Sequence, residues 1–179
     1  MSVTAHEISR EHDSEAFDAE HCSVRRALEV FGLRSSLLLL REAFYGTRRF
    51  DDFARRVGIT EQVTATRLKA LVEEGLLRRE PYREPGQRTR SEYRLTAKGR
   101  DLYPVLVALM QWGDTYNPGP AGPPIRLTHR GCGEPISAEV RCAAGHEVSV
   151  RDVAVLPGFA TRLEKPETAA PKRLPGARW

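Results

Sequence analysis

The sequence predicts a mainly α fold with one small β-hairpin, followed by a small C-terminal β module. Three observations predict this class. Apolar residues recur at helical spacing through most of residues 22–116, and two strand-like runs flank a Pro-Gly turn within that span. Short alternating runs return only after a stretch rich in proline and glycine. The chain is 40% hydrophobic, which suffices for one ordinary core.

Composition divides the chain into five parts. Residues 1–21 hold six acidic residues against one basic residue, which predicts a mobile acidic arm and no signal peptide. The main domain follows at 22–116, and residues 117–124 (NPGPAGPP) form a stiff linker. A small β module is expected at 125–160 and a disordered tail at 161–179. No run approaches the roughly 20 apolar residues of a membrane span, so we expect a cytoplasmic protein.

Four helices are expected in the first half of the main domain. The first three cover Cys22–Phe31, Arg34–Tyr45 and the stretch from Asp51 to Val57, each closed by a glycine. Asp51 and Asp52 favour a helix start because acidic side chains complement the positive end of the helix dipole. After a short turn at Gly58, Thr60 caps a fourth helix that ends before Gly75.

A hairpin and a long helix complete the main domain. Strands are expected at 76–82 and 91–96, and Pro85-Gly86 marks the turn between them. Thr96 then caps a long last helix, which Pro104 should kink or restart. Three helices, a fourth after a tight turn, and then a hairpin are the element order of a winged helix-turn-helix.

The outer side of the fourth helix carries residue types that read DNA bases. A helical wheel places the core-facing side chains together: Thr64, Leu68, Leu71 and Val72. Opposite them lie Gln62, Thr66 and Lys69, with Thr60 and Arg67 at the edge. Glutamine pairs with adenine, a threonine methyl contacts thymine, and lysine reaches guanine acceptors. Any soluble helix also needs polar residues there, so the wheel alone leaves plain solvation open.

The arginines at the hairpin tip favour DNA as the binding partner. Arg88 and Arg90 lie on or beside the tip, where arginine follows a phosphate backbone or enters a narrow minor groove. Residues 22–117 hold eighteen Lys and Arg against twelve Asp and Glu. A solvated basic loop is the alternative, but a basic hairpin directly after a polar reading helix favours double-stranded DNA as the partner.

Six segments in the main domain resemble the HxlR branch of bacterial winged-helix regulators, relatives of the MarR type. In order they are CSVRRALEVFG, LLLLRE, GTRRFDDFARRVGIT, RLKALVEEGLLRRE, SEYRLTAKGRDLYPVLVAL and QWG. The resemblance implies a homodimer, built by the first helix and the long last helix, that represses from a pseudo-palindromic operator. It places Thr60, Gln62, Thr66 and Arg67 on the recognition helix, and it places Arg88 and Arg90 on the wing.

The last helix independently suggests a partner surface. Between Leu102 and Trp112 its apolar residues cover more of the circumference than one core contact needs. Either a second copy or the C-terminal module covers this excess. A two-fold dimer would place two reading helices about one DNA turn, ~34 Å, apart.

Cys22 is a candidate redox sensor. Some members of the resembled family sense electrophiles or oxidants through a cysteine at this place. Arg25 and Arg26 lie about one turn further on, and a helix N-terminus with nearby cations makes a thiol more reactive. The other interpretation is a small buried residue.

The C-terminal module contains a candidate zinc set. His129-x-x-Cys132 and Cys142-x-x-x-His146 offer four ligands of the kind tetrahedral zinc takes, each pair beside a glycine turn. Zinc ribbons normally carry two C-x-x-C knuckles, and neither pair is one. Zinc and ordinary packing without metal both stay open, and no other cofactor is indicated.

No enzyme pattern is present in the sequence. It contains no Ser/His/Asp set, no phosphate-binding glycine loop and no paired carboxylates in a suitable context. We therefore expect a transcriptional regulator whose effector is unknown. The alternative is a winged-helix protein-interaction module that no longer binds DNA and docks a partner through the C-terminal β module.

Overall fold

The computed structural model describes residues 22–83, 86 and 88–155. The predicted arm at 1–21 and tail at 161–179 lie outside these residues. The chain forms two units, one of residues 23–147 and one that combines residues 1–22 with 148–179. In the described part of the second unit, the one regular element is the short 3-10 helix η2, Val150–Asp152. None of the described helices is long and apolar enough to cross a membrane.

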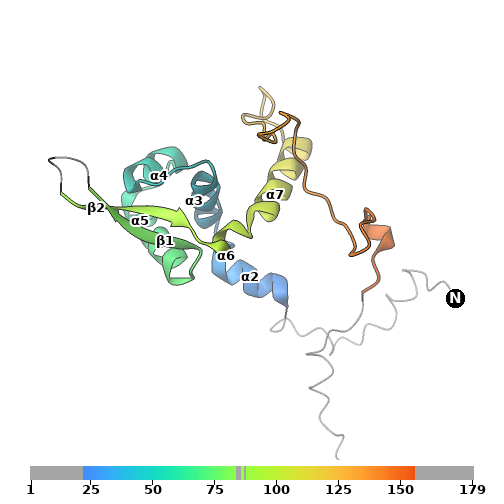
Figure 1. The fold of residues 1–179 in the computed structure, drawn as a ribbon, viewed down its shortest axis with the longest axis horizontal. Coiled ribbons are helices and arrows are strands. Elements are labelled where there is room, and N and C mark those ends of the chain that lie inside the picture. The colour runs from blue at the N-terminus through green and yellow to red at the C-terminus, as the bar shows by residue number, and fades with distance from the viewer. Residues whose placement is uncertain (1–21, 84–85, 87, 156–179) are drawn as a thin grey trace, which may run out of the picture. The chain divides into compact units, whose positions relative to one another are not determined.

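The unit of residues 23–147 has the predicted winged helix-turn-helix order (Figure 1). In chain order the elements are α2 (Ser23–Phe31), α3 (Arg34–Phe44), α4 (Phe50–Val57), α5 (Glu61–Glu73), β1 (Leu77–Tyr82), β2 (Arg90–Leu95), α6 (Ala97–Arg100) and α7 (Tyr103–Tyr116). Helices α4 and α5 are the helix-turn-helix pair, and the β1–β2 hairpin is the wing. The boundaries of α2 to α5 and of both strands differ from the predicted ones by one residue at most.

The helix predicted after Thr96 is divided in two. Pro104 lies in the first turn of α7, where its missing N–H costs nothing, so the helix restarts there. The Thr96 hydroxyl accepts a hydrogen bond from the Gly99 N–H at 3.0 Å and donates one to the Gly75 carbonyl at 2.6 Å. Helix α6 is therefore tied to the turn that precedes the wing.

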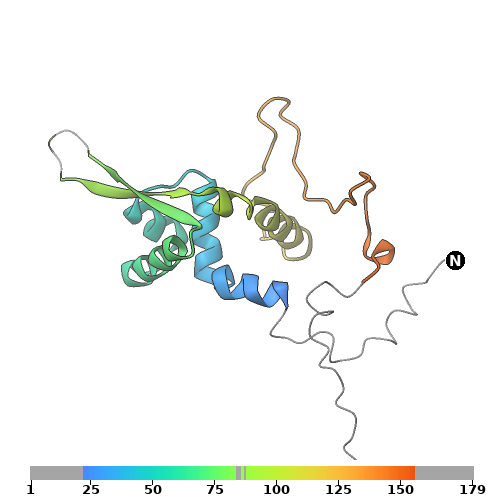
Figure 2. The ribbon, with the colours of Figure 1, turned by 60° about the horizontal axis from the view of Figure 1, so that its bottom comes forward.

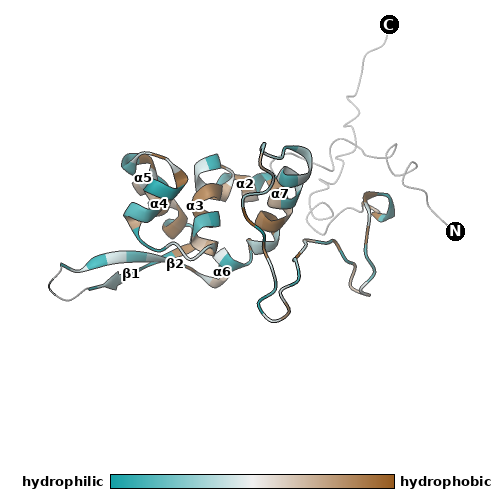
Figure 3. Ribbon diagram, turned by 90° about the horizontal axis from the view of Figure 1, so that it is seen from above, coloured by the Kyte–Doolittle hydropathy of each residue, from teal (hydrophilic) through white to brown (hydrophobic). Residues whose placement is uncertain are grey.

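The core lies between α3, α4, α5 and the base of the wing. Its fully buried apolar side chains are Leu39, Leu40, Phe53, Leu68, Leu71, Leu76 and Leu77. The Phe53 ring meets the Tyr93 ring edge-on, with centroids 6.1 Å apart, which joins α4 to the wing. Thr64 is buried as predicted, and its hydroxyl donates to the Thr60 carbonyl at 2.9 Å. Figure 3 shows hydrophobic residues concentrated on α3 and α7.

The wing is an antiparallel hairpin that extends beyond the helices (Figures 1 and 2). Its register runs from the Leu77–Leu95 pair at the base to the Tyr82–Arg90 pair near the tip. Arg49, in the link predicted to be extended, forms an isolated antiparallel bridge with Glu92. The segment before α4 therefore lies along the edge of β2.

Residues 125–155 contain two bridged turns and no continuous strand among the described residues. One turn is closed by the Thr128–Pro135 bridge and the other by the Arg141–Glu147 bridge. The predicted β module is therefore reduced to these turns, and residues 156–160 lie outside the described part. Most side chains in the segment are exposed, so a sheet here would bury no apolar face of its own.

The C-terminal segment is attached to α7 by a hydrogen bond. The Ala138 N–H donates to the Gln111 side-chain oxygen at 2.7 Å. Trp112 and Tyr116 stay 63% and 72% exposed beside this contact. The segment thus leaves Trp112 and Tyr116 uncovered, contrary to one of the two coverings considered for that helix.

Candidate nucleic-acid interface

The reading helix α5 starts from a tight, capped turn. Gly58 adopts a left-handed conformation with φ of 70°, which a side chain would disfavour. The Thr60 hydroxyl accepts a hydrogen bond from the Val63 N–H at 3.3 Å. This cap satisfies one of the open N–H groups of the first turn and fixes where α5 begins.

The outer side of α5 presents an amide, a methyl group and an ammonium. Gln62, Thr66 and Lys69 are all exposed, as predicted. The Thr66 hydroxyl donates to the Gln62 carbonyl at 2.9 Å, so the methyl is the part of Thr66 left for a partner. Lys69 lies 3.6 Å from Glu73, and both are largely exposed. Such a pair contributes little to stability and is readily exchanged for another acceptor.

Arg67 differs from the other predicted contacts on α5. It is half-buried, and its Nε is enclosed without a hydrogen-bond partner among the described residues. Its place at the edge of the wheel is confirmed, but it does not share the open outer row. Val63, which lies outside the apolar cluster of the helical wheel, is 38% exposed instead.

One face of the wing is neutralised by ion pairs. Glu80 accepts from Arg78 at 2.5 Å and from Arg94 at 2.8 Å, and Arg94 also pairs with Glu92. The hydrogen bond from Arg78 is the main reason that the pKa of Glu80 lies below its ordinary value. These arginines already have acceptors within the hairpin.

The predicted wing arginines have no such acceptors. Arg88 and Arg90 are exposed, and neither side chain has an ion pair or hydrogen bond within the described part of the chain. Two further arginines that sequence reasoning missed, Arg49 and Arg79, line a cleft together with Arg90. Arg49 and Arg79 lie 30 positions apart in the chain. The bridge between residue 49 and β2, together with the hydrogen bond from the Tyr93 N–H to the Arg48 carbonyl at 2.8 Å, brings them together.

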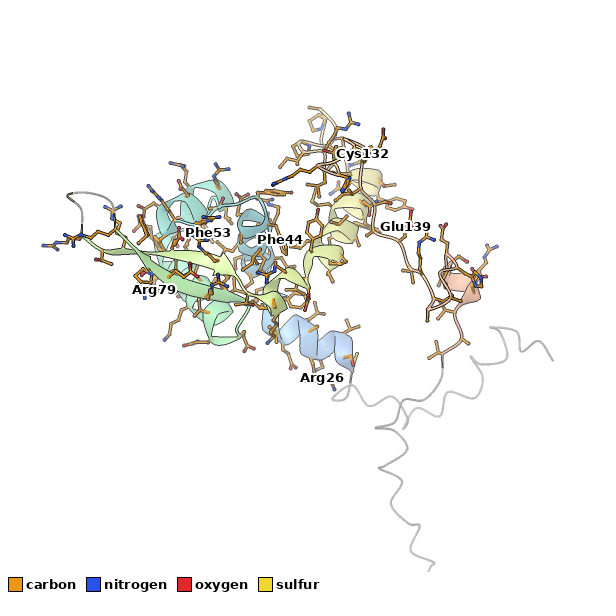
Figure 4. All side chains as sticks on the ribbon, viewed as in Figure 1. Arg26, Phe44, Phe53, Arg79, Cys132 and Glu139 are labelled. Atoms are coloured by element: carbon orange, nitrogen blue, oxygen red, sulfur yellow. The ribbon has the colours of Figure 1, made fainter. Side chains whose placement is uncertain are left out.

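The four predicted zinc ligands are not assembled in this structure. His129 Nδ1 and Cys132 Sγ are 3.2 Å apart, and Cys132 is labelled in Figure 4. In the other turn, the Cys142 N–H donates to the His146 carbonyl at 3.0 Å. No three His, Cys, Asp or Glu side chains gather at a possible metal site among the described residues. Zinc binding therefore stays a prediction.

Cys22 directly precedes α2 and is exposed. Cys22 is therefore not buried within the single chain, and burial by a second copy stays a prediction. Arg25 and Arg26 are turned to partners on their own helix, Glu29 at 3.1 Å and Ser23 at 3.1 Å. A redox role for Cys22 stays a prediction.

A helix-turn-helix with this basic wing matches a known family. Residues 30–120 match the family described as HxlR-like helix-turn-helix. The chain belongs to this family. A relative in Mycobacterium tuberculosis, the uncharacterised HTH-type transcriptional regulator Rv3095, is 49% identical over 146 residues, which cover 81% of this chain and 90% of that protein. The HTH-type transcriptional regulator YdeP of Bacillus subtilis is 31% identical over 105 residues, 58% of this chain and 80% of that protein.

Solved structures agree with the family. PA1607, described as a proposed transcription factor, is 37% identical with a TM-score of 0.69, and the match covers 78% of this chain and 97% of that one. PA1374 of Pseudomonas aeruginosa is 38% identical with a TM-score of 0.54, covering 78% and 94%. Both matches exceed residues 30–120, so the likeness reaches beyond the family span. This HxlR-like protein is a DNA-binding transcriptional regulator.

Proposed function

We propose that this HxlR-like regulator is a homodimeric repressor that binds a pseudo-palindromic operator in double-stranded DNA. Helix α5 enters the major groove, and the wing follows the backbone or the minor groove beside it. The observation that carries the proposal is the open row Gln62, Thr66 and Lys69 on α5, next to a wing whose Arg88 and Arg90 have no acceptors in the described chain. The protein acts where the chromosome lies, in the cytoplasm, and no catalytic step is needed.

The three side chains of the row on α5 contact different chemical groups of the DNA bases. The Gln62 amide pairs with an adenine edge, the Thr66 methyl contacts a thymine methyl, and Lys69 reaches guanine acceptors. Glu73, at the far end of the row, would be repelled by phosphate. The N-terminal turns of α5 therefore enter the groove, with Thr60 at the entry and Arg67 beside the row.

Exposed apolar residues on α2 support the dimer. Helix α2 buries none of its residues in the single chain, and Val24 and Leu28 are 67% and 52% exposed. A helix of 9 residues is marginal in water without packing, so α2 needs a surface to lie against.

Helix α7 offers a matching stripe. Val105, Leu109, Trp112 and Tyr116 recur every three or four residues and are all more than 40% exposed. Burying one such side chain stabilises an interface by roughly 1.5–3 kcal/mol. Two copies of α2 and α7 around a two-fold axis would cover both apolar surfaces with the same contact.

The division of labour is tested by binding to the DNA upstream of the protein's own gene. Gln62→Ala should lose discrimination at one base position, worth about 1–3 kcal/mol, and keep its affinity for random duplex. Arg90→Ala should weaken binding to every duplex and flatten the dependence of the binding constant on salt. Fluorescence anisotropy over a salt series measures both. Equal losses from both variants on all sequences would contradict the proposal, and no binding to any duplex at low salt would favour the protein-interaction module.

The dimer is tested by sedimentation velocity. Leu109→Glu places a charge in the α7 stripe and should convert a dimer into a monomer. Val140→Glu is the matched control, because Val140 is 68% exposed on the C-terminal segment and lies outside α2 and α7. A wild-type chain that sediments as a monomer at the concentrations that bind DNA would rule out the homodimer. A reporter gene fused to the upstream DNA then distinguishes repression from activation, because loss of a repressor raises expression of the reporter.

A further inference from the structure

We propose that the cleft between the wing and the start of α4 is a phosphate-binding site that takes a phosphate group of the DNA backbone. The cleft has a volume of about 410 Å³ and is lined by Arg49, Arg79 and Arg90. The proposal rests on the orientation given above, in which the wing meets DNA. It adds Arg49 and Arg79 to the binding surface, which neither the sequence patterns nor the comparisons assign.

The arginines of the wing differ in whether an acidic side chain of the hairpin already binds them. Arg78 and Arg79 are neighbours on β1, and successive side chains of a strand lie on opposite faces. Arg78 is held by Glu80 on the outer face. Arg79 is paired across the hairpin with Tyr93, on the face that meets the helices, and its side chain has no ion pair or hydrogen bond within the described chain. Figure 4 shows Arg79 on the hairpin beside those helices.

Contacts with the wing hold the third arginine in place. The Arg49 guanidinium lies over the Tyr82 ring, 5.2 Å from its centroid, and the Arg49 backbone is bridged to Glu92. This arrangement positions Arg49 at the cleft wall. The lining contains three arginines and one acidic residue, Asp51.

The lining favours a phosphate over other ligands. A planar guanidinium donates two parallel hydrogen bonds to a phosphate, and Tyr82, Ser91 and Tyr93 add hydroxyl groups to the wall. An apolar effector would find few apolar contacts there, which small-molecule sites normally supply. A phosphate of the DNA backbone and a phosphorylated small molecule share this chemistry. The backbone is favoured because Arg90 lies both in the cleft and beside the wing tip.

The DNA arm of the test compares Arg79→Gln with Arg78→Gln in the full chain. Both variants lose one positive charge from adjacent positions on β1, so a difference between them reports where the charge points. Each phosphate contact contributes about 0.9 to the slope of log K against log salt. With two clefts per dimer, Arg79→Gln should reduce the slope by about 1.8 on operator and random duplex alike. Arg78→Gln should leave the slope unchanged, and equal slopes for the two variants would overturn the proposal.

The phosphate arm uses the protein without DNA. Inorganic phosphate is titrated while NMR follows the side-chain Nε–H signals of the arginines, and melting curves confirm that both variants are folded. The Arg79 signal should shift and saturate in the wild-type chain and in Arg78→Gln. Absence of a saturable shift overturns the site. A saturable shift combined with an unchanged DNA slope for Arg79→Gln overturns the backbone assignment, because the cleft then serves a free phosphorylated molecule.

The DNA-binding and phosphate experiments distinguish failure of the phosphate site from failure of the proposed DNA-binding function. If the wild-type chain binds no duplex, the proposed division of labour fails. Saturable phosphate binding that requires Arg79 would still support the cleft as a phosphate site.

Discussion

Gly99 is buried where α6 crosses the end of the wing, and alanine at this position should destabilise the fold. A Cβ built on Gly99 would lie 2.1 Å from the Leu76 carbonyl oxygen and 3.1 Å from Cδ2 of Leu95. The Leu76 carbonyl already accepts a hydrogen bond from the Thr96 N–H at 3.1 Å. Because the closest atom belongs to the backbone, a rotamer change cannot relieve the contact.

The size of the destabilisation follows from the backbone shift that the added methyl group requires. To reach an ordinary contact, α6 or the Leu76 peptide must shift by more than an ångström. Strain of this kind costs about 1–3 kcal/mol. Weakening the hydrogen bonds around Thr96 adds about 0.5–1.5 kcal/mol. The higher helix propensity of alanine returns about 1 kcal/mol. We expect a net loss of about 2 kcal/mol, which lowers the melting temperature by roughly 5–10 °C.

Urea unfolding followed by circular dichroism measures this loss. Gly119→Ala is the matched control, since a Cβ on Gly119 meets nothing within 4 Å and Gly119 does not have a positive φ. This control should be neutral or slightly stabilising, because alanine restricts the unfolded chain. A Gly99→Ala chain within about 0.5 kcal/mol of wild type would show that the α6 crossing is softer than the distances imply.

Two further predictions concern ionised side chains. Glu42 is 7% exposed at its side chain and accepts from Arg41 at 2.9 Å and from the Thr47 hydroxyl at 3.1 Å. Glu42→Ala should lower the free energy of unfolding by about 2–4 kcal/mol. This is less than the cost of breaking a fully buried ion pair, because the Arg41 side chain is a third exposed. Glu42→Gln should cost clearly less than Glu42→Ala. Arg78→Gln should raise the pKa of Glu80 toward its ordinary 4.5, which NMR titration of the carboxyl carbon checks. Since the folded pKa is lowered, the stabilisation is present above 4.5 and is lost as the pH falls through the folded value, and an unchanged pKa would contradict the assigned cause.

Local signals made most of the fold predictable. Gly58 and Gly75 both have φ of 70°, a conformation that glycine adopts without strain, and both end helices where predicted. Thr60 caps α5 and Pro104 restarts the last helix, because both act through their own backbone neighbourhood. The helical spacing of apolar residues also predicted which side of α5 faces the core.

The remaining features depend on contacts between distant segments. Arg79 and Arg49 line one cleft because the segment before α4 lies along β2, and no pattern in the sequence contains that register. Arg67 is half-buried because neighbouring segments enclose its Nε, whereas the wheel describes α5 alone. In the C-terminal segment, glycine turns were predicted, but alternation over a few residues did not provide enough apolar surface for a sheet.

The break between α6 and α7 has a geometric consequence for operator choice. Helix α6 is tied to the turn before the wing, whereas α7 packs on α3 and belongs to the proposed two-fold contact. In the proposed dimer, Asp101 and Leu102 between the two helices are therefore the joint of each half-molecule. Helix α7 has 14 residues and is about 21 Å long, so a 10° change at the joint displaces its far end by nearly 4 Å. That displacement is comparable to the rise of one base pair. The joint therefore determines which separations between half-sites the pair of reading helices can span.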